Sequence, residues 1–291
     1  MEARSLGPVG LEILDIDLSA PVDQQTSDRI QALLLEAELV VFRDQHLSDE
    51  TLVGFARRFG SLEGGRFAQQ SDASRSEIVV LSNALENDRP IGLMDVGQYW
   101  HSDGTFLPVP DMYTMLYGVE IPSAPDGSPL GDTLFVSATQ AWADLPDDAR
   151  ARLAGLQAVS SYEYRFQLRL ARNPALASAR ARTAGSDPRH PVARPHPLTG
   201  KVALFVNEGY TTRIEGLPQE ESDAWLKMLY AHLYRPDRQY RHRWRPGDLL
   251  VWDNNATQHC AISDYRLPQV RRMKRVSVKE APSTASEQGG C

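Results

Sequence analysis

The sequence Tyr-Trp-His-Ser-Asp-Gly-Thr-Phe at residues 99–106 places a histidine and an aspartate, His101 and Asp103, two positions apart. On an extended backbone, side chains two positions apart point to the same face, so an imidazole and a carboxylate are expected to converge. A second histidine, His259, ends the stretch Trp-Asp-Asn-Asn-Ala-Thr-Gln-His at residues 252–259. We therefore expect a fold that brings two segments far apart in the sequence to one point.

These three residue types form a recognisable ligand set. Two histidines and one carboxylate on one face of a metal, with the other positions open, are the ligands of non-haem Fe(II) oxygenases. Each residue also has an ordinary interpretation: Asp103 could cap a turn at Gly104, and His259 could be a core or surface histidine. A His-x-Asp pair alone is common by chance. The remaining histidines have no evident partner in the sequence and are interpreted as structural: His46, His190, His196, His232 and His242.

Composition narrows the class of protein. Of the 291 residues, 42% are hydrophobic and 24% are charged, as in an ordinary globular protein. We expect a single domain over residues 1–281 and a disordered tail over residues 282–291, which is rich in Ser, Gly and Gln. The net charge of −7 argues against nucleic acid or an anionic membrane as the main partner. A small molecule is the expected ligand.

The sequence also predicts a location. No apolar run is long enough to cross a bilayer, and the N-terminus lacks the apolar core of a signal peptide. The two cysteines, Cys260 and Cys291, do not have a Cys-x-x-Cys spacing. We therefore predict a cytoplasmic protein whose thiols are reduced.

Hydrophobic periodicity predicts many short strands and a few helices. Thr26 or Ser27 is the expected cap of the first helix and Ser48 that of the second, which Gly60 ends. This mostly β pattern with packed helices is typical of a double-stranded β-helix, the cupin-like jelly roll. The expected strands cover residues 10–18, 39–42, 77–82, 112–120, 132–136, 201–206, 240–244, 249–253 and 275–278. The expected helices cover residues 26–37, 48–60, 138–156 with an interruption at Pro146, and 218–232.

Residues 165–195 have the least regular pattern. The part from Arg165 to Arg182 is rich in Ala, Arg and Leu and is predicted to be helical, whereas residues 183–195 are predicted to form an exposed loop. We interpret the whole region as an insertion or lid that orders on substrate binding. Its arginines could face an anionic substrate.

Several motifs together resemble one family. The chain resembles the taurine dioxygenase and 2,4-dichlorophenoxyacetate dioxygenase family of Fe(II)- and 2-oxoglutarate-dependent oxygenases over residues 10–278. This resemblance implies the double-stranded β-helix fold, with His101, Asp103 and His259 as the iron ligands and 2-oxoglutarate and O2 as co-substrates. The motifs are Trp100-His101-Ser102-Asp103, Gly131-Asp132-Thr133, Phe205-Val206-Asn207, Arg213-Ile-Glu-Gly216, Tyr240-Arg-His-Arg-Trp244, Gly247-Asp248 and Trp252-Asp253-Asn254.

The resemblance also assigns the anion-binding residues. The distal carboxylate of 2-oxoglutarate suits an arginine, whose planar fork donates two parallel hydrogen bonds to a carboxylate. By resemblance, Arg271 and Thr133 hold this carboxylate, and Arg275 lies where some members bind the anionic group of the substrate. Taurine enzymes carry a sulfonate-binding histidine after the second helix, whereas residues 59–68 here contain none. Taurine is therefore not the expected substrate.

The sequence thus predicts an oxidoreductase that oxidises an aliphatic C–H bond of a small anionic substrate and releases succinate and CO2. Hydroxylation is the first interpretation. The alternatives are desaturation or cyclisation in a biosynthetic pathway with the same cofactors, and a non-catalytic barrel that binds an anion or metal. A homo-oligomer, either a dimer or a tetramer, is expected from the family resemblance alone.

Overall fold

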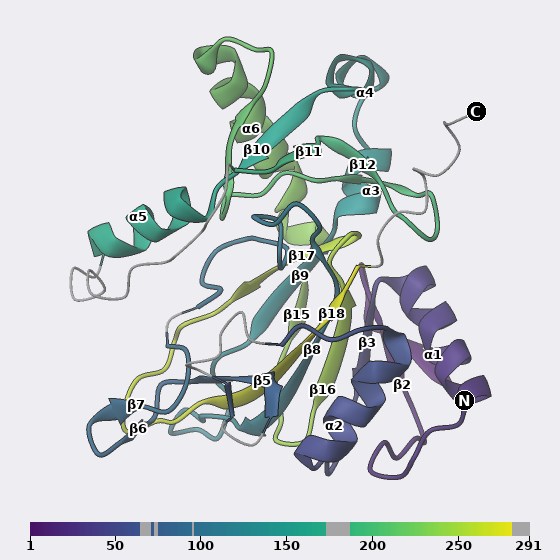
Figure 1. Cartoon of the computed structure of the whole chain (residues 1–291), viewed down its shortest axis with the longest axis vertical. Helices are drawn as coiled ribbons and strands as arrows, with labels where there is room; N and C mark the ends of the chain where they lie inside the picture. The colour runs from purple at the N-terminus through teal and green to yellow at the C-terminus, as the bar shows by residue number, and fades with distance from the viewer. Residues whose placement is uncertain (65–70, 73–74, 95, 173–186, 281–291) are drawn as a thin grey trace, which may run out of the picture.

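A computed structural model describes residues 1–64, 71–72, 75–94, 96–172 and 187–280. The fold is mostly β with some helices (Figure 1). Its largest sheet has eight strands, in the order β1 (Ala3–Ser5), β2 (Leu11–Ile13), β3 (Leu39–Phe42), β16 (Leu249–Asp253), β8 (Asp111–Glu120), β18 (Arg272–Lys279), β5 (Arg75–Ser82) and β4 (Ser71–Asp72). A second sheet has the order β15 (Tyr240–His242), β9 (Thr133–Ser137) and β17 (Thr257–Ala261).

Strand alternation gives the large sheet two buried faces. In β3, Val40 and Phe42 pack in one apolar cluster with the helices α1 (Gln24–Ala37) and α2 (Asp49–Ala56). Leu39 of the same strand belongs to a different cluster, which includes Phe135 and Tyr240 of the second sheet. Because successive side chains on a strand point to opposite faces, the all-apolar sequence of β3 fits a strand covered on both sides. Figure 1 shows α1 and α2 together beside the large sheet.

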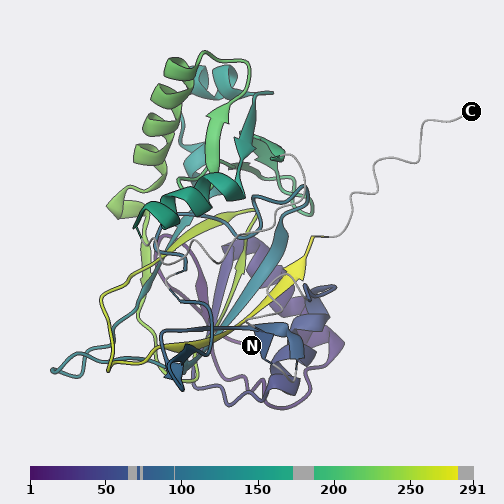
Figure 2. The ribbon, with the colours of Figure 1, turned by 60° about the vertical axis from the view of Figure 1, so that its left-hand side comes forward.

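The remaining elements form a third layer around a separate apolar cluster, which includes Ala141, Leu204 and Leu229. Figure 2 shows this layer above the two sheets. It contains α3 (Ala138–Ala143), α4 (Asp147–Leu153), β10 (Gln157–Ser160), α5 (Tyr162–Arg172), β11 (Arg189–Pro191), β12 (Ala193–Pro195), β13 (Val202–Leu204), β14 (Thr211–Ile214) and α6 (Gln219–Leu233). The short elements β6 (Leu85–Glu86), β7 (Arg89–Pro90), η1 (Arg57–Phe59) and η3 (Pro236–Arg238) complete the described chain.

Several boundaries differ from the sequence prediction. The strand predicted at residues 10–18 ends at Ile13, because Asp15 turns the chain with a left-handed φ of 54°. The first helix is capped by Asp23 rather than by Thr26 or Ser27: the Asp23 carboxylate accepts the Thr26 amide at 2.7 Å. The cap of α2 was predicted correctly, since Ser48 Oγ accepts the Thr51 amide at 3.1 Å.

The region predicted as an insertion is only partly a loop. Its helix, α5, begins at Tyr162, and residues 173–186 lie outside the described part of the chain. The prediction of an exposed loop over residues 183–195 was wrong for residues 189–195, where β11 pairs with β10 and β12 with β13. His190 and Val192 are buried there. Polar residues and two prolines in this segment do not indicate a strand from the sequence alone. The pairing arises from contact with strands elsewhere in the chain.

The corrected helix cap gives a stability prediction. We expect Asp23→Ala to lower the free energy of unfolding by about 1 kcal/mol, because the Thr26 amide loses its acceptor at the end of α1. Urea titrations of Asp23→Ala and of Gln25→Ala, an exposed residue of the same helix, provide the measurement and its control. A larger loss in Thr26→Ala than in Asp23→Ala would assign the cap to Thr26 instead.

Candidate metal centre

His101 and His259 are joined by a short antiparallel bridge. The His101 amide donates to the His259 carbonyl at 3.1 Å, and the His259 amide donates to the His101 carbonyl at 2.9 Å. His259 lies on β17, whereas His101 belongs to the connection that precedes β8. The two residues are therefore held side by side by main-chain hydrogen bonds, and their ring centroids lie 4.1 Å apart.

Asp103 reaches the same point from a turn. The prediction of an extended backbone through residues 101–103 was only partly right, since the chain turns from Asp103 onward. Gly104, at φ +75°, makes this turn possible, because a Cβ there would lie 2.5 Å from the Asp111 amide nitrogen. The Asp103 amide donates to Asn254 Oδ1 at 3.2 Å, which fixes the start of the turn to the end of β16.

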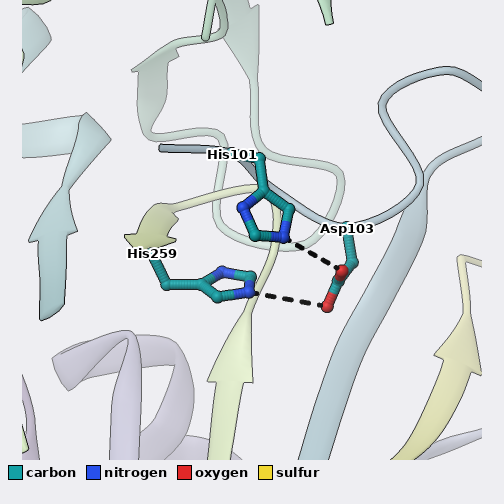
Figure 3. Close-up of side chains that lie close together, drawn as sticks. All are labelled: His101, Asp103 and His259. Carbon is teal, nitrogen blue, oxygen red and sulfur yellow. Dashed lines mark ion pairs between the residues drawn. The ribbon is translucent and has the colours of Figure 1, made fainter. Parts of the chain in front are cut away.

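The three side chains converge on one point (Figure 3). His101 Nε2 lies 3.7 Å from Asp103 Oδ1, and His259 Nε2 lies 3.9 Å from Asp103 Oδ2. The three donor atoms all lie within 4.8 Å of one another, and all three residues are buried. Two imidazole nitrogens and one carboxylate oxygen are the donor set preferred by non-haem Fe(II) sites, so the residues present fit that metal.

Neighbouring groups orient both rings. His101 Nδ1 hydrogen-bonds the Tyr99 carbonyl at 2.8 Å, which directs Nε2 toward Asp103. The ring of His259 packs against Trp252 and Phe135, with centroid distances of 4.7 and 5.8 Å. Trp252 belongs to an apolar core cluster and also fixes the position of a donor.

Asp103 is held by a hydrogen-bond chain that the sequence analysis missed. Thr114 Oγ1 on β8 donates to Asp103 Oδ2 at 2.7 Å, and Asn254 Nδ2 donates to Thr114 Oγ1 at 3.0 Å. Trp252 Nε1 in turn donates to Asn254 Oδ1 at 3.0 Å. Trp252 and Asn254 stand in a motif preceding His259, but Thr114 carries no sequence signal, because its role arises only from strand pairing.

The environment sets the charge of each donor. Burial lowers the pKa of His101, and burial together with His101 lowers the pKa of His259 to about 3. Burial alone would raise the pKa of Asp103, but His259 and Arg275 lower the pKa of this carboxyl well below its ordinary value. Near neutral pH the imidazoles are therefore neutral and the carboxylate is ionised, which are the states that bind a cation.

The donors open into a cavity that also contains the predicted anion-binding residues Thr133, Arg271 and Arg275. Arg271 is 6% exposed, and its Nε has no hydrogen-bond partner among the described residues. Gly131 makes room for this side chain: at φ +77°, a Cβ there would lie 2.8 Å from Arg271 Cδ and Nε. Thr133 Oγ1 accepts from Trp244 Nε1 at 3.0 Å, so its own hydrogen can point to another acceptor.

Arg275 occupies a different position in the cavity. Its Nη1 lies 3.7 Å from Asp103 Oδ1, so it is close to a candidate metal ligand. Arg271 precedes β18 and Arg275 lies within it, with an irregular register between residues 272 and 273. The structure places both arginines in the lining of this cavity.

Comparison with known proteins gives a consistent result. The family model described as taurine catabolism dioxygenase TauD, TfdA family matches residues 2–277. The alpha-ketoglutarate-dependent sulfate ester dioxygenase of Pseudomonas putida is 30% identical, over 94% of this chain and 87% of that protein. The alpha-ketoglutarate-dependent 2,4-dichlorophenoxyacetate dioxygenase of Cupriavidus pinatubonensis is 33% identical, over 84% and 86%. The crystal structure of a taurine dioxygenase from Burkholderia xenovorans has a TM-score of 0.79 at 29% identity, covering 96% of this chain and 89% of that one.

The support for Asp103 gives a second prediction. Thr114→Val keeps the shape of the side chain but removes the donor to Asp103, so we expect Mn(II) affinity to fall by about 10-fold or more. Electron paramagnetic resonance of free Mn(II) during titration measures this. Thr212→Val, which removes a hydroxyl that donates to the Val159 carbonyl outside the cavity, is the control. Equal Mn(II) affinities in Thr114→Val and the unmodified protein would show that this hydroxyl does not support the site.

Proposed function

The chain belongs to the taurine catabolism dioxygenase TauD, TfdA family, and from that premise we propose that it hydroxylates an aliphatic C–H bond of a small anionic substrate. It is an enzyme of the alpha-ketoglutarate-dependent dioxygenases, which use Fe(II), 2-oxoglutarate and O2. One observation carries the proposal: His101, Asp103 and His259 converge in a cavity that is also lined by the buried guanidinium of Arg271.

Each donor has a proposed role. His101, Asp103 and His259 would hold the iron, which would supply the oxidising chemistry with 2-oxoglutarate and O2 as co-substrates. Their contribution is to stay rigid: main-chain hydrogen bonds fix His101 to His259, and Thr114 fixes Asp103. Three protein ligands leave the other coordination positions to co-substrate and oxygen. The two sheets around the site are proposed to form a double-stranded β-helix, in one domain over residues 1–281.

Arg271 is the proposed partner of the distal carboxylate of 2-oxoglutarate. A buried guanidinium is unfavourable unless an anion pairs with it, and the Nε of Arg271 has no hydrogen-bond partner among the described residues. The hydroxyl of Thr133 lies in the same cavity and can donate to the same carboxylate. Together they offer a carboxylate a planar fork and a hydroxyl donor.

Arg275 is proposed to contact the anionic group of the substrate from the side of the metal. Its ion pair with Asp103 at 3.7 Å keeps the guanidinium beside the reaction site. Losing Arg275 should therefore disturb how the substrate is placed against the metal.

The oligomeric state is proposed, from the family alone, to be a dimer or tetramer. No described helix is long and apolar enough to cross a membrane.

Turnover tests the proposed reaction. The enzyme, Fe(II), ascorbate and 2-oxoglutarate are incubated with sulfate esters, sulfonates, aryloxyacids and amino acids, and succinate is measured for each. We expect at least one anionic compound to stimulate succinate release and to gain one oxygen atom by mass spectrometry. The oxygen is found in the intact hydroxylated product or, where the hydroxyl lies beside a heteroatom, in the carbonyl fragment left when the C–heteroatom bond breaks. Loss of two hydrogens without oxygen gain would replace hydroxylation by desaturation or cyclisation. Absence of succinate with every compound would contradict the proposal.

The two arginines give a third prediction. Arg271→Ala should leave the distal carboxylate of 2-oxoglutarate without a charged partner, which costs about 2–4 kcal/mol of binding free energy. Because about 1.4 kcal/mol corresponds to a tenfold change, the apparent KM for 2-oxoglutarate should rise by roughly 30-fold or more. Arg275→Ala should leave this KM nearly unchanged and should uncouple succinate formation from substrate oxidation.

The control for both variants is Arg152→Ala. Arg152 lies on α4, outside the cavity, where it pairs with Glu221 at 2.7 Å. A larger effect on 2-oxoglutarate in Arg275→Ala than in Arg271→Ala would reverse the two assignments.

A further inference from the structure

Helix α5 buries the side of its surface that carries arginines. Arg165 is 7% exposed, whereas Tyr164 and Leu168 are 40% and 37% exposed. An amphipathic helix on a protein surface usually does the opposite, burying apolar side chains and exposing charged ones. The inverted arrangement indicates that the buried face of α5 serves a polar ligand rather than the core.

Arg165 and Arg169 of α5 face the cavity of the metal centre. Tyr162, Arg165, Phe166 and Arg169 all contribute to the lining of that cavity. Residues three and four apart share one face of a helix, so these four positions form a single stripe of two cations and two aromatic rings. The exposed side of α5 includes Glu163, Tyr164, Gln167 and Leu168, none of which lines the cavity.

Arg165 is buried, and no anionic partner for it lies among the described residues. No carboxylate among the described residues forms an ion pair with Arg165 or Arg169, and Arg165 Nε has no hydrogen-bond partner there. The guanidinium of Arg165 instead lies over the ring of Tyr99, 3.4 Å from its centroid. A cation–π contact stabilises the charge but accepts no N–H hydrogen bond in the guanidinium plane. The edge of Arg165 is therefore available to an oxyanion.

Tyr99 connects this position to the metal centre. Its ring centroid lies 4.8 Å from that of His101, and its carbonyl accepts from His101 Nδ1. Its hydroxyl is 3.0 Å from that of Tyr210, and the Tyr210 ring also contacts Phe106 at 5.0 Å. An anion bound at Arg165 would thus lie at one end of an aromatic wall whose other end reaches a proposed iron ligand.

We propose that Arg165 and Arg169 bind the anionic group of the substrate from the α5 side and so determine which substrates the enzyme accepts. The substrate class is an oxyanion, such as a sulfate ester, sulfonate or carboxylate, with an apolar body that packs against Phe106, Tyr162 and Phe166. Among the described residues that line the cavity, the only carboxylates are Asp103 and Asp111. Asp103 is a proposed ligand, and Asp111 is buried. An ammonium group on the substrate therefore finds little to pair with.

The two arginine positions have different roles. Arg275 is tied to Asp103 and acts next to the metal, so its loss should impair coupling. Arg165 and Arg169 lie on α5. They should control the affinity for the substrate, and their loss should leave succinate formation coupled to substrate oxidation. This inference rests on the proposed function, because it assigns a substrate to the same cavity.

Binding of probe compounds tests the proposal without turnover. The enzyme is loaded with Mn(II) and N-oxalylglycine, which does not react, and is titrated by calorimetry with hexyl sulfate, hexanesulfonate, 2,4-dichlorophenoxyacetate and hexan-1-ol. We expect the enzyme to bind at least one of the three anions and to bind hexan-1-ol at least tenfold more weakly. The three anions distinguish which oxyanion is preferred.

Variants then locate the anion. Arg165→Ala combined with Arg169→Ala should lower the affinity for the bound probe at least tenfold. The affinity of Arg165→Lys should lie between those of the double variant and the unmodified enzyme, because lysine keeps the charge but loses the planar fork. Gln167→Ala, on the exposed side of α5, and Arg152→Ala should bind the probe as the unmodified enzyme does. In turnover, Arg165→Ala should raise the KM for the substrate without uncoupling.

Two results would overturn the proposal: wild-type affinity in the double variant, or failure of the unmodified enzyme to bind any of the three anions. N-oxalylglycine affinity, measured in every variant, shows whether the fold and the metal centre are intact. If the unmodified enzyme binds neither N-oxalylglycine nor an anion, the proposed function fails together with this inference. If it binds N-oxalylglycine alone, only this inference fails.

Discussion

Burial of the Asp103 carboxylate is the constraint on which the site depends. A buried, ionised carboxylate is strongly unfavourable unless hydrogen bonds and opposite charges surround it. Here Thr114 donates to one oxygen, Arg275 approaches the other, and both histidines lie within 4 Å of the carboxylate. The site is thus arranged around one negative charge, and a divalent cation between the three donors would complete its neutralisation.

The fold supplies these partners from distant parts of the chain. β16 and β17 are consecutive strands that belong to different sheets, and Asn254 lies in the connection between them. Asn254 therefore reaches both the Asp103 amide and the Thr114 hydroxyl, while His259 follows on β17. Because β8 is paired with both β16 and β18, Thr114 and Arg275 are carried into the same region. Strand pairing, more than any local motif, builds the site.

The difference between local motifs and strand pairing explains which features could be predicted from the sequence. The convergence of His101, Asp103 and His259 and the family were predictable, because the residue types and motifs carry the chemistry themselves. Strands such as β3, β8 and β16 and the Ser48 cap were also predictable, since hydrophobic period and capping are local properties. Three features were not predictable, because each depends on contacts with a segment far away in the sequence. They are the role of Thr114, the strands at residues 189–195 and the arginine face of α5. Arg66, another arginine that could pair with an anionic group of the substrate, lies outside the described residues.

The most direct test of the central claim is the visible spectrum of the enzyme with Fe(II) and 2-oxoglutarate in the absence of O2. The account predicts a weak charge-transfer band in the unmodified enzyme, its loss in His101→Ala and in His259→Ala, and its retention in His46→Ala, where an exposed histidine is removed. If His101→Ala or His259→Ala kept both the band and full turnover, the proposed ligand set would be wrong.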